Sequence, residues 1–213
     1  MRPPADWRKA RFTLGIAGVT AAVWAIVSLL GLQEYAAVWG GFIPARVGGL
    51  EGDEILAPAF LTPLTSAFLH IDIVHLALNL VILVFCGRSI EPILGGRGIV
   101  ILYVLGAYAA AAATWLWDPA GLAPLIGASG AVSAVIGAFA ILLGRNRVKV
   151  ANPTVGLLLH ALWLAAAWIG LQILIGLTFE TSGLRIAIAA HIGGFLLGLA
   201  LARPLLLLRW RGA

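Results

Sequence analysis

Six long runs of apolar residues, nearly free of charged side chains, constrain this chain more than any other feature of its sequence. Each run is long enough to cross the hydrocarbon core of a bilayer as an α-helix, which satisfies its own backbone hydrogen bonds in lipid. With 62% of its residues hydrophobic and 11% charged, the chain lacks the polar surface of a soluble domain. The sequence therefore predicts an all-α membrane protein, a bundle of six transmembrane helices. The expected spans are 12–32, 69–87, 98–117, 127–144, 154–177 and 184–208.

These spans divide the chain into an N-terminal segment, 1–11, a membrane domain, 12–208, and a tail, 209–213. The first run follows a basic stretch, as the apolar part of a signal peptide does. It is too long for a signal peptide and lacks a cleavage site of small residues, so we expect it to be retained. The connection 33–68 is the one long connection, and because it is apolar in places we expect it to lie against the membrane.

The positive charges predict how the bundle is oriented. If the N-terminus is cytoplasmic and six spans alternate, twelve of the fourteen Lys and Arg residues fall on the cytoplasmic side. Cytoplasmic loops are enriched in these residues. We therefore expect both termini in the cytoplasm and the connection 33–68 outside, in the cell membrane of a prokaryote. The two exceptions are Arg46 and Arg185.

The net charge of +5 does not indicate a nucleic-acid partner, because the cations are scattered between apolar runs and do not form one basic face. Cys86 is the single cysteine, which excludes an internal disulfide and any cysteine-based metal site. We expect no metal and no cofactor. The bilayer is the expected partner, and the sequence does not specify an oligomeric state.

A few polar side chains lie inside the spans, where they are costly and therefore mark candidate sites. Counted from the arginine at the cytoplasmic end of each span, His75, Ser129 and His191 lie about 20, 24 and 18 Å into the membrane. These depths agree within about one helical turn, which indicates one buried polar site in the outer half of the membrane. Asn79 follows His75 by four positions and so shares its helix face.

Ser129 combines several features of a nucleophile. It is expected in the first turn of its helix, where unpaired backbone N–H groups and the positive end of the helix dipole favour a developing anion. Gly127 and Gly130 allow backbone and substrate to approach closely. A hydroxyl nucleophile needs a base, and His191 lies at matching depth on another helix that opens outward. No carboxylate lies beside it in the interior of a span, and Asp72 is near the outer end of its span, so the sequence favours a Ser–His dyad.

Each of these residues also has a structural interpretation, because small and polar residues commonly pack transmembrane helices together. His75 could serve as the base, with His191 only a packing residue. The glycines after His191 favour it as the base, since they permit close helix contact. Gln172 and His160 are expected to have structural roles, and Glu91 to order its cytoplasmic turn.

Four motifs in a fixed order resemble those of the rhomboid family of intramembrane serine proteases. They are Phe68-Leu69-His70 with His75 and Asn79, Gly87-Arg88 with Glu91 and Gly95, Gly127-Ala128-Ser129-Gly130, and Ala190-His191 with Gly194 and Gly198. The resemblance covers about residues 61–202. It implies a compact six-helix bundle whose short fourth helix begins inside the membrane, facing a water-filled cavity open to the outside. It also implies hydrolysis of peptide bonds in or near transmembrane segments of membrane proteins.

The resemblance implies a role for each motif residue. Ser129 matches the nucleophile, and His191 matches the general base and acid. His75 and Asn79 match side chains that join the Ser129 backbone N–H in an oxyanion hole, beside Gly127. The residues expected to support the site are His70, which matches a histidine that steadies the first loop, and Gly130, Gly194 and Gly198.

Two features depart from the family pattern. Many members carry an aromatic residue four positions after the nucleophile, where it stacks on the catalytic histidine, and this chain has Ser133. The first loop often carries a Trp-Arg pair, which the segment 33–68 lacks. Neither departure removes a reacting group.

Two other functions would also use a polar cluster inside the membrane. A catalytically inactive rhomboid-like protein would bind transmembrane segments without cleaving them, but such relatives generally lack the serine or the histidine. A small transporter would be expected to show repeated halves or carboxylates within its spans. Since this chain keeps Ser129 and His191 and shows neither transporter feature, its sequence favours the protease.

Overall fold

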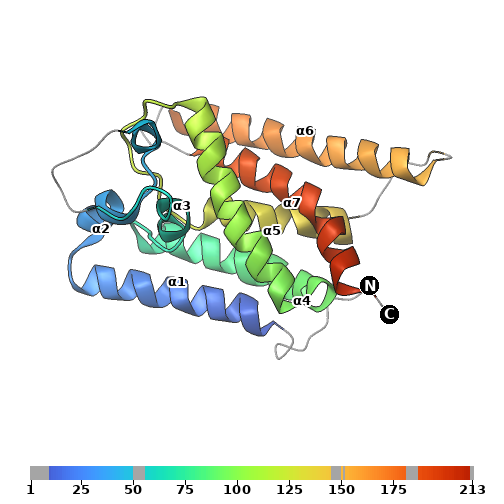
Figure 1. The fold of residues 1–213 in the computed structure, drawn as a ribbon, viewed down its shortest axis with the longest axis horizontal. Coiled ribbons are helices and arrows are strands. Elements are labelled where there is room, and N and C mark those ends of the chain that lie inside the picture. The colour runs from blue at the N-terminus through green and yellow to red at the C-terminus, as the bar shows by residue number, and fades with distance from the viewer. Residues whose placement is uncertain (1–9, 50–55, 145–149, 151, 181–186, 212–213) are drawn as a thin grey trace.

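The computed structural model describes residues 10–49, 56–144, 150, 152–180 and 187–211, and side chains of α6 as far as Leu174. This part of the chain contains helices and one isolated β-bridge, with no strand. The helices are α1 (Arg11–Leu29), α2 (Gln33–Gly40), the short 3₁₀ helix η2 (Pro44–Gly48), α3 (Thr62–Ser66), α4 (Ile73–Trp117), α5 (Ser129–Leu143), α6 (Pro153–Glu180) and α7 (Ile188–Arg209). Figure 1 shows their arrangement.

The prediction of an all-α membrane protein is confirmed for the described residues. Four of their helices are long and apolar enough to cross a membrane: α1, α4, α6 over Pro153–Leu174, and α7. The α5 helix is shorter, with 15 residues. The expected long connection 33–68 contains α2, η2 and α3, so much of it is folded into short helices.

The α4 helix contains two of the predicted spans. A straight helix of its 45 residues would be about 68 Å long, roughly twice the thickness of the hydrocarbon core. Gly95 interrupts it with φ 77° and ψ 163°, a conformation open to glycine because it has no Cβ. The two arms, 73–94 and 96–117, therefore run in different directions (Figure 1). The predicted connection 88–97 is wrong in extent, since the backbone stays helical there except at Gly95.

The end of the bundle at the Gly95 bend also holds the start of α1 and the end of α7. Glu91 is buried and accepts hydrogen bonds from the backbone N–H groups of Phe12 (3.0 Å) and Thr13 (2.8 Å) and from the Thr13 hydroxyl. The indole N–H of Trp210 donates to the Ile93 carbonyl at 3.2 Å. Glu91, expected to order its own turn, thus caps α1, whose N-cap residue provides no side-chain hydrogen bond.

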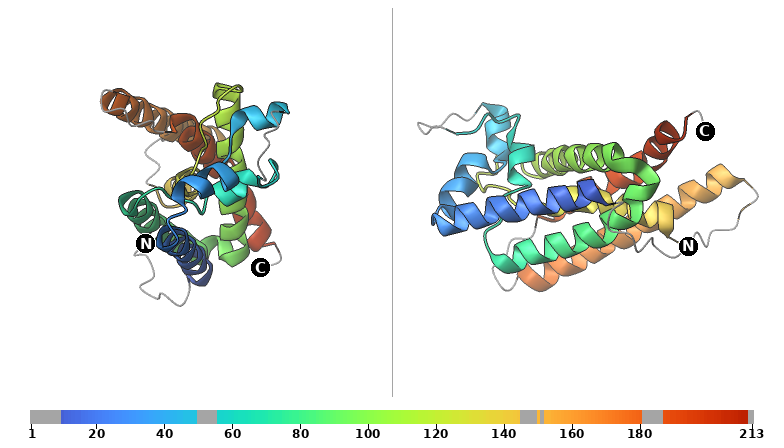
Figure 2. Two further views of the ribbon diagram at one scale, coloured as in Figure 1. Left: turned by 90° about the vertical axis from the view of Figure 1, so that its left-hand side faces the viewer. Right: turned by 90° about the horizontal axis from the view of Figure 1, so that it is seen from below.

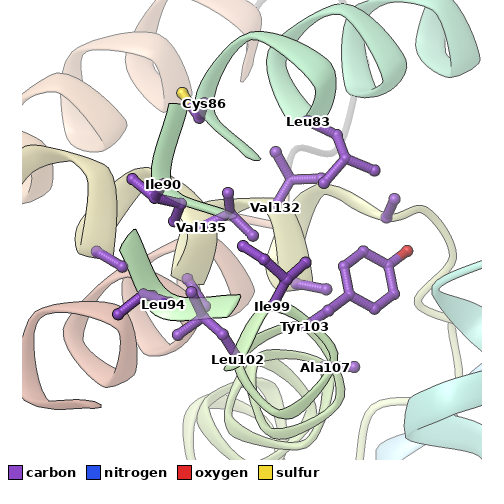
Figure 3. Packing of buried hydrophobic residues seen from close by; sticks show 14 of the residues in the cluster. Leu83, Cys86, Ile90, Leu94, Ile99, Leu102, Tyr103, Ala107, Val132 and Val135 are labelled. Carbon is purple, nitrogen blue, oxygen red and sulfur yellow. The ribbon is translucent and has the colours of Figure 1, made fainter. Parts of the chain in front are cut away.

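The α5 helix lies inside the bundle and packs against both α4 and α7 (Figures 1 and 2). Glycines allow this close approach. A Cβ on Gly198 would meet the Ala134 carbonyl oxygen, and a Cβ on Gly194 would meet that of Gly130. Figure 3 shows larger side chains of α4 and α5 filling the adjoining core, including Leu83, Ile90, Ile99, Leu102, Tyr103, Val132 and Val135. The α6 helix lies at an edge of the bundle, beside α7.

Candidate active site

The structure places the side chains of Ser129 and His191 in contact. Ser129 is the first residue of α5, and His191 lies in the first turn of α7. Their Oγ and Nε2 atoms are 2.8 Å apart, within hydrogen-bond distance. Both residues are half-buried, so the pair is shielded without being sealed inside the core.

The second ring nitrogen of His191 also has a partner. Its Nδ1 atom lies 3.0 Å from Oε1 of Gln172, on α6. The amide oxygen can only accept a hydrogen bond, which assigns the ring proton to Nδ1 and leaves the Nε2 lone pair facing Ser129. Gln172, expected to be a structural residue, therefore lies directly against the candidate base. The rule that marked His191, a polar side chain inside a span, also applied to Gln172.

The backbone before Ser129 is held in an unusual conformation by Gly127. This glycine has φ 114°, which residues with a Cβ rarely adopt. Its N–H donates to the Ser66 carbonyl at 2.9 Å. A Cβ added there would lie 2.6 Å from the His75 ring, so His75 packs directly against the turn that leads into α5. Sequence reasoning expected Gly127 and His75 near the nucleophile, and the structure places both there.

A second set of contacts joins His70, Asn79 and Ala128. The amide nitrogen of Asn79 donates to His70 Nε2 (3.2 Å) and to the His75 carbonyl (3.0 Å). The N–H of Ala128 also donates to His70 Nε2, at 3.3 Å. Burial, helped by the neighbouring His75, lowers the pKa of His70 to about 4, so the ring is neutral and its Nε2 lone pair can accept both bonds.

These contacts add detail to what the sequence predicts for His70 and Asn79. His70, expected to steady the first loop, binds α4 and the residue before Ser129. Both amide hydrogens of Asn79 are engaged within this group and do not point to Ser129. His75 contacts the His70 ring edge-to-face, with ring centres 4.9 Å apart.

The remaining residues expected near the site contribute to packing. The Ser133 hydroxyl donates to the Ser129 carbonyl at 2.7 Å. Gly130 packs on Ala110 of α4, and Gly194 packs on Gly130. Gly198 lies farther along the same contact between α5 and α7. A cavity of about 10 Å³, the size of one water molecule, adjoins Ser129 and is lined by Gly127, Ser66 and Ala190 among others.

Comparison with known proteins places this geometry in a family. A family profile described as "Rhomboid domain" matches residues 58–208. The chain is 31% identical over 140 residues to rhomboid protease GlpG of Serratia proteamaculans, an alignment covering 65% of this chain and 45% of that protein. It is 30% identical over 158 residues to rhomboid protease GluP of Bacillus subtilis, covering 74% of this chain and 28% of the relative.

A third relative, rhomboid protease GlpG of Pectobacterium atrosepticum, is 28% identical over 193 residues, covering 89% of this chain and 61% of the relative. The chain thus spans less than two thirds of the length of these relatives. Its apolar helices and bacterial relatives make it a multi-pass integral membrane protein of a prokaryote. From the match over residues 58–208, we conclude that this chain belongs to the rhomboid family.

Proposed function

We propose that this chain is an intramembrane serine protease that hydrolyses peptide bonds in or near the transmembrane segments of other membrane proteins. The observation that carries the proposal is the 2.8 Å separation between Ser129 Oγ and His191 Nε2. A serine hydroxyl is a weak nucleophile until a neighbouring base takes its proton, and this pair provides both groups. The names of the relatives, rhomboid proteases, agree with this chemistry.

In the proposed reaction, Ser129 Oγ attacks the carbonyl carbon of the peptide bond while its proton passes to His191 Nε2. The tetrahedral intermediate then collapses as the same proton moves to the leaving nitrogen, which breaks the C–N bond and leaves an ester on Ser129. His191 next takes a proton from water, whose oxygen attacks the ester carbonyl. The second collapse returns this proton to Ser129 Oγ and releases the carboxylic acid. These steps require no metal or cofactor.

The negative oxygen of each tetrahedral intermediate needs hydrogen-bond donors. The backbone N–H of Ser129 lies in the first turn of α5, where such groups lack helical partners and the helix dipole favours negative charge. We assign His75 and Asn79 as the side-chain donors, beside Gly127. In the structure, the amide hydrogens of Asn79 are donated to His70 and to the His75 carbonyl. Asn79 must therefore release His70 before it can donate a hydrogen bond to the oxyanion.

The proposed orientation places the active site in the outer half of the membrane. Each arm of α4 crosses once, and with α1, α5, α6 and α7 this gives six crossings. The start of α1 and the end of α7 then lie on the cytoplasmic side, together with the Gly95 bend. The hydrogen bonds of Glu91 with the start of α1 and of Trp210 with the Ile93 carbonyl hold these three segments at one end of the bundle, which supports this arrangement.

The proposal is tested by labelling with a fluorophosphonate, which reacts with activated serines. The purified chain in detergent should be labelled, and Ser129→Ala should not. A reporter with one transmembrane segment should be cleaved by the native chain and left intact by Ser129→Ala. A folded native chain that neither reacts with the probe nor cleaves a panel of such reporters would instead favour a rhomboid-like protein that binds transmembrane segments without cleaving them.

A further inference from the structure

We propose that Gln172, on α6, is a positioning residue that holds His191 in the tautomer and orientation needed to activate Ser129. This inference rests on the proposed function. It departs from the expectation that helix packing alone orients the base. The carrying observation is the 3.0 Å separation between Gln172 Oε1 and His191 Nδ1, on the opposite side of the ring from Ser129.

A neutral imidazole carries its single ring proton on one nitrogen only. If the proton sits on Nε2, His191 has no lone pair for the Ser129 proton and cannot act as the base. A hydrogen-bond acceptor beside Nδ1 favours the productive tautomer, because the Nδ1–H group then has a partner. Gln172 Oε1 is such an acceptor. The same contact also restricts rotation of the ring about its χ2 torsion, which would otherwise move Nε2 away from Ser129.

The location of Gln172 explains why an amide suits this role. The residue is 4% exposed and lies on an apolar helix, between exposed Leu171 and Ile173. A carboxylate at such a position must be desolvated and is costly within a membrane. An amide provides an oxygen acceptor without a net charge. Burial without a partner would itself be unfavourable for this amide, and His191 satisfies its oxygen.

Trp168 adds a second contact from α6, one turn before Gln172. Its indole N–H donates to the His191 backbone carbonyl at 3.3 Å. Its ring stacks on Phe195 of α7, with ring centres 4.8 Å apart and planes inclined by 8°. The α6 helix therefore contacts the candidate base through both ring and backbone. A helix at the edge of the bundle, which carries no reacting atom, thus contributes to the geometry of the dyad.

Three variants test the inference in the full chain. Gln172→Leu removes the acceptor and introduces an apolar side chain of similar size, which is compatible with a membrane helix. Gln172→Glu keeps an oxygen acceptor at the same position, because a carboxyl group buried in such apolar surroundings is held in its neutral, protonated form. Leu171→Ala, at a neighbouring exposed position, is the matched control. The measurements are the second-order rate of fluorophosphonate labelling, kcat and KM for a transmembrane reporter, and the melting temperature of each variant.

We expect Gln172→Leu to lower the labelling rate and kcat about tenfold, with KM unchanged. A loss of this size corresponds to roughly one hydrogen bond that orients the base. Gln172→Glu should restore most of the rate, and Leu171→Ala should match the native chain. Labelling of Gln172→Leu at the native rate would overturn the inference, as would equal losses in the Leu and Glu variants. Absence of labelling in the native chain would instead contradict the proposed function, so the two failures are distinguishable.

Discussion

His191 Nε2 lies 2.8 Å from Ser129 Oγ although 62 positions separate the two residues, and the absence of a side chain at Gly194 makes this approach possible. Gly194 follows His191 by almost one turn of α7 and packs on the carbonyl of Gly130, the residue after the serine. A Cβ there would push α7 away from α5. The packing of the two helices therefore sets the distance between the nucleophile and its base.

Removing either member of the dyad should abolish cleavage. We expect Ser129→Ala and His191→Ala to be inactive, and the double variant to be no worse than either single variant. The reason is that a base without a nucleophile has nothing to activate, and an unassisted serine is scarcely reactive. The measurement is reporter cleavage, with fluorophosphonate labelling of Ser129 in the histidine variant.

His75 provides the control for this assignment, because it is another histidine close to the Ser129 turn. A folded His191→Ala chain that labels Ser129 at the native rate would contradict the dyad. If His75→Ala alone abolished labelling in that comparison, His75 would become the candidate base.

The glycine contact between α5 and α7 should be intolerant of even one methyl group. We expect Gly198→Ala to lower the melting temperature and the activity, because its Cβ would collide with the Ala134 carbonyl oxygen on α5. Gly170→Ala is the matched control, since a Cβ there meets nothing within 4 Å. That control should be neutral or more stable by up to about 1 kcal/mol, the helix preference of alanine over glycine. Equal melting temperatures for the two variants would contradict the packing argument.

The length of the apolar runs was sufficient to predict much of the fold. The expected span 12–32 corresponds to α1 (Arg11–Leu29), and 184–208 to α7 (Ile188–Arg209). Burial in lipid requires long apolar helices, so composition alone locates them. The exact course of 88–97 was not predicted, because glycines and a proline are typical of a loop. In the structure the helix is interrupted there at Gly95 alone.

The candidate site was predictable where chemistry marks single residues and less so where it depends on contacts. Polar residues at one depth indicated that Ser129 and His191 come together, as the structure shows. The partner of Gln172 could not be deduced, because the rotation of α6 about its own axis depends on tertiary packing. The pairing of Asn79 with His70 could not be deduced either, because His70 lies outside the regular helix and helical periodicity does not fix its position.

Glu91 should stabilise the bundle at the end opposite Ser129. We expect Glu91→Ala to destabilise the protein by about 1–3 kcal/mol, because it leaves the backbone N–H groups of Phe12 and of the buried Thr13 without their acceptor. Thr13→Val, which removes only the hydroxyl, should have a smaller effect. The check is thermal unfolding in detergent. A native melting temperature for Glu91→Ala would contradict the capping role.

The proposed oxyanion donors should affect turnover more than stability. Removal of one such donor typically lowers the rate about a hundred- to a thousandfold. We expect His75→Ala and Asn79→Ala each to lower kcat, with milder losses if the backbone N–H of Ser129 compensates in part. Reporter kinetics and melting temperatures should be measured together. Near-native turnover in the folded double variant would exclude both residues from the oxyanion hole.

Acidification should weaken the contacts around His70. Burial is the main reason that its pKa falls from about 6.5 to about 4, with His75 adding to the effect and Asp72 opposing it. Between these two pH values the unfolded chain binds a proton that the folded chain excludes, so folding is penalised progressively as the pH falls. Stability from this group is therefore complete above about pH 6.5 and decreases toward pH 4. Protonation of Nε2 would also break the hydrogen bonds from Asn79 and Ala128.

The measurement is the melting temperature in detergent from pH 8 to pH 4, for the native chain and for His70→Gln. A glutamine can still provide an oxygen acceptor to Ala128 but does not titrate in this range. We expect the native chain to lose more stability on acidification than His70→Gln, with the difference developing below about pH 6.5. The two curves should run parallel above that pH, where the histidine is neutral in both the folded and the unfolded chain. Parallel curves over the whole range would show that His70 does not cause the acid sensitivity.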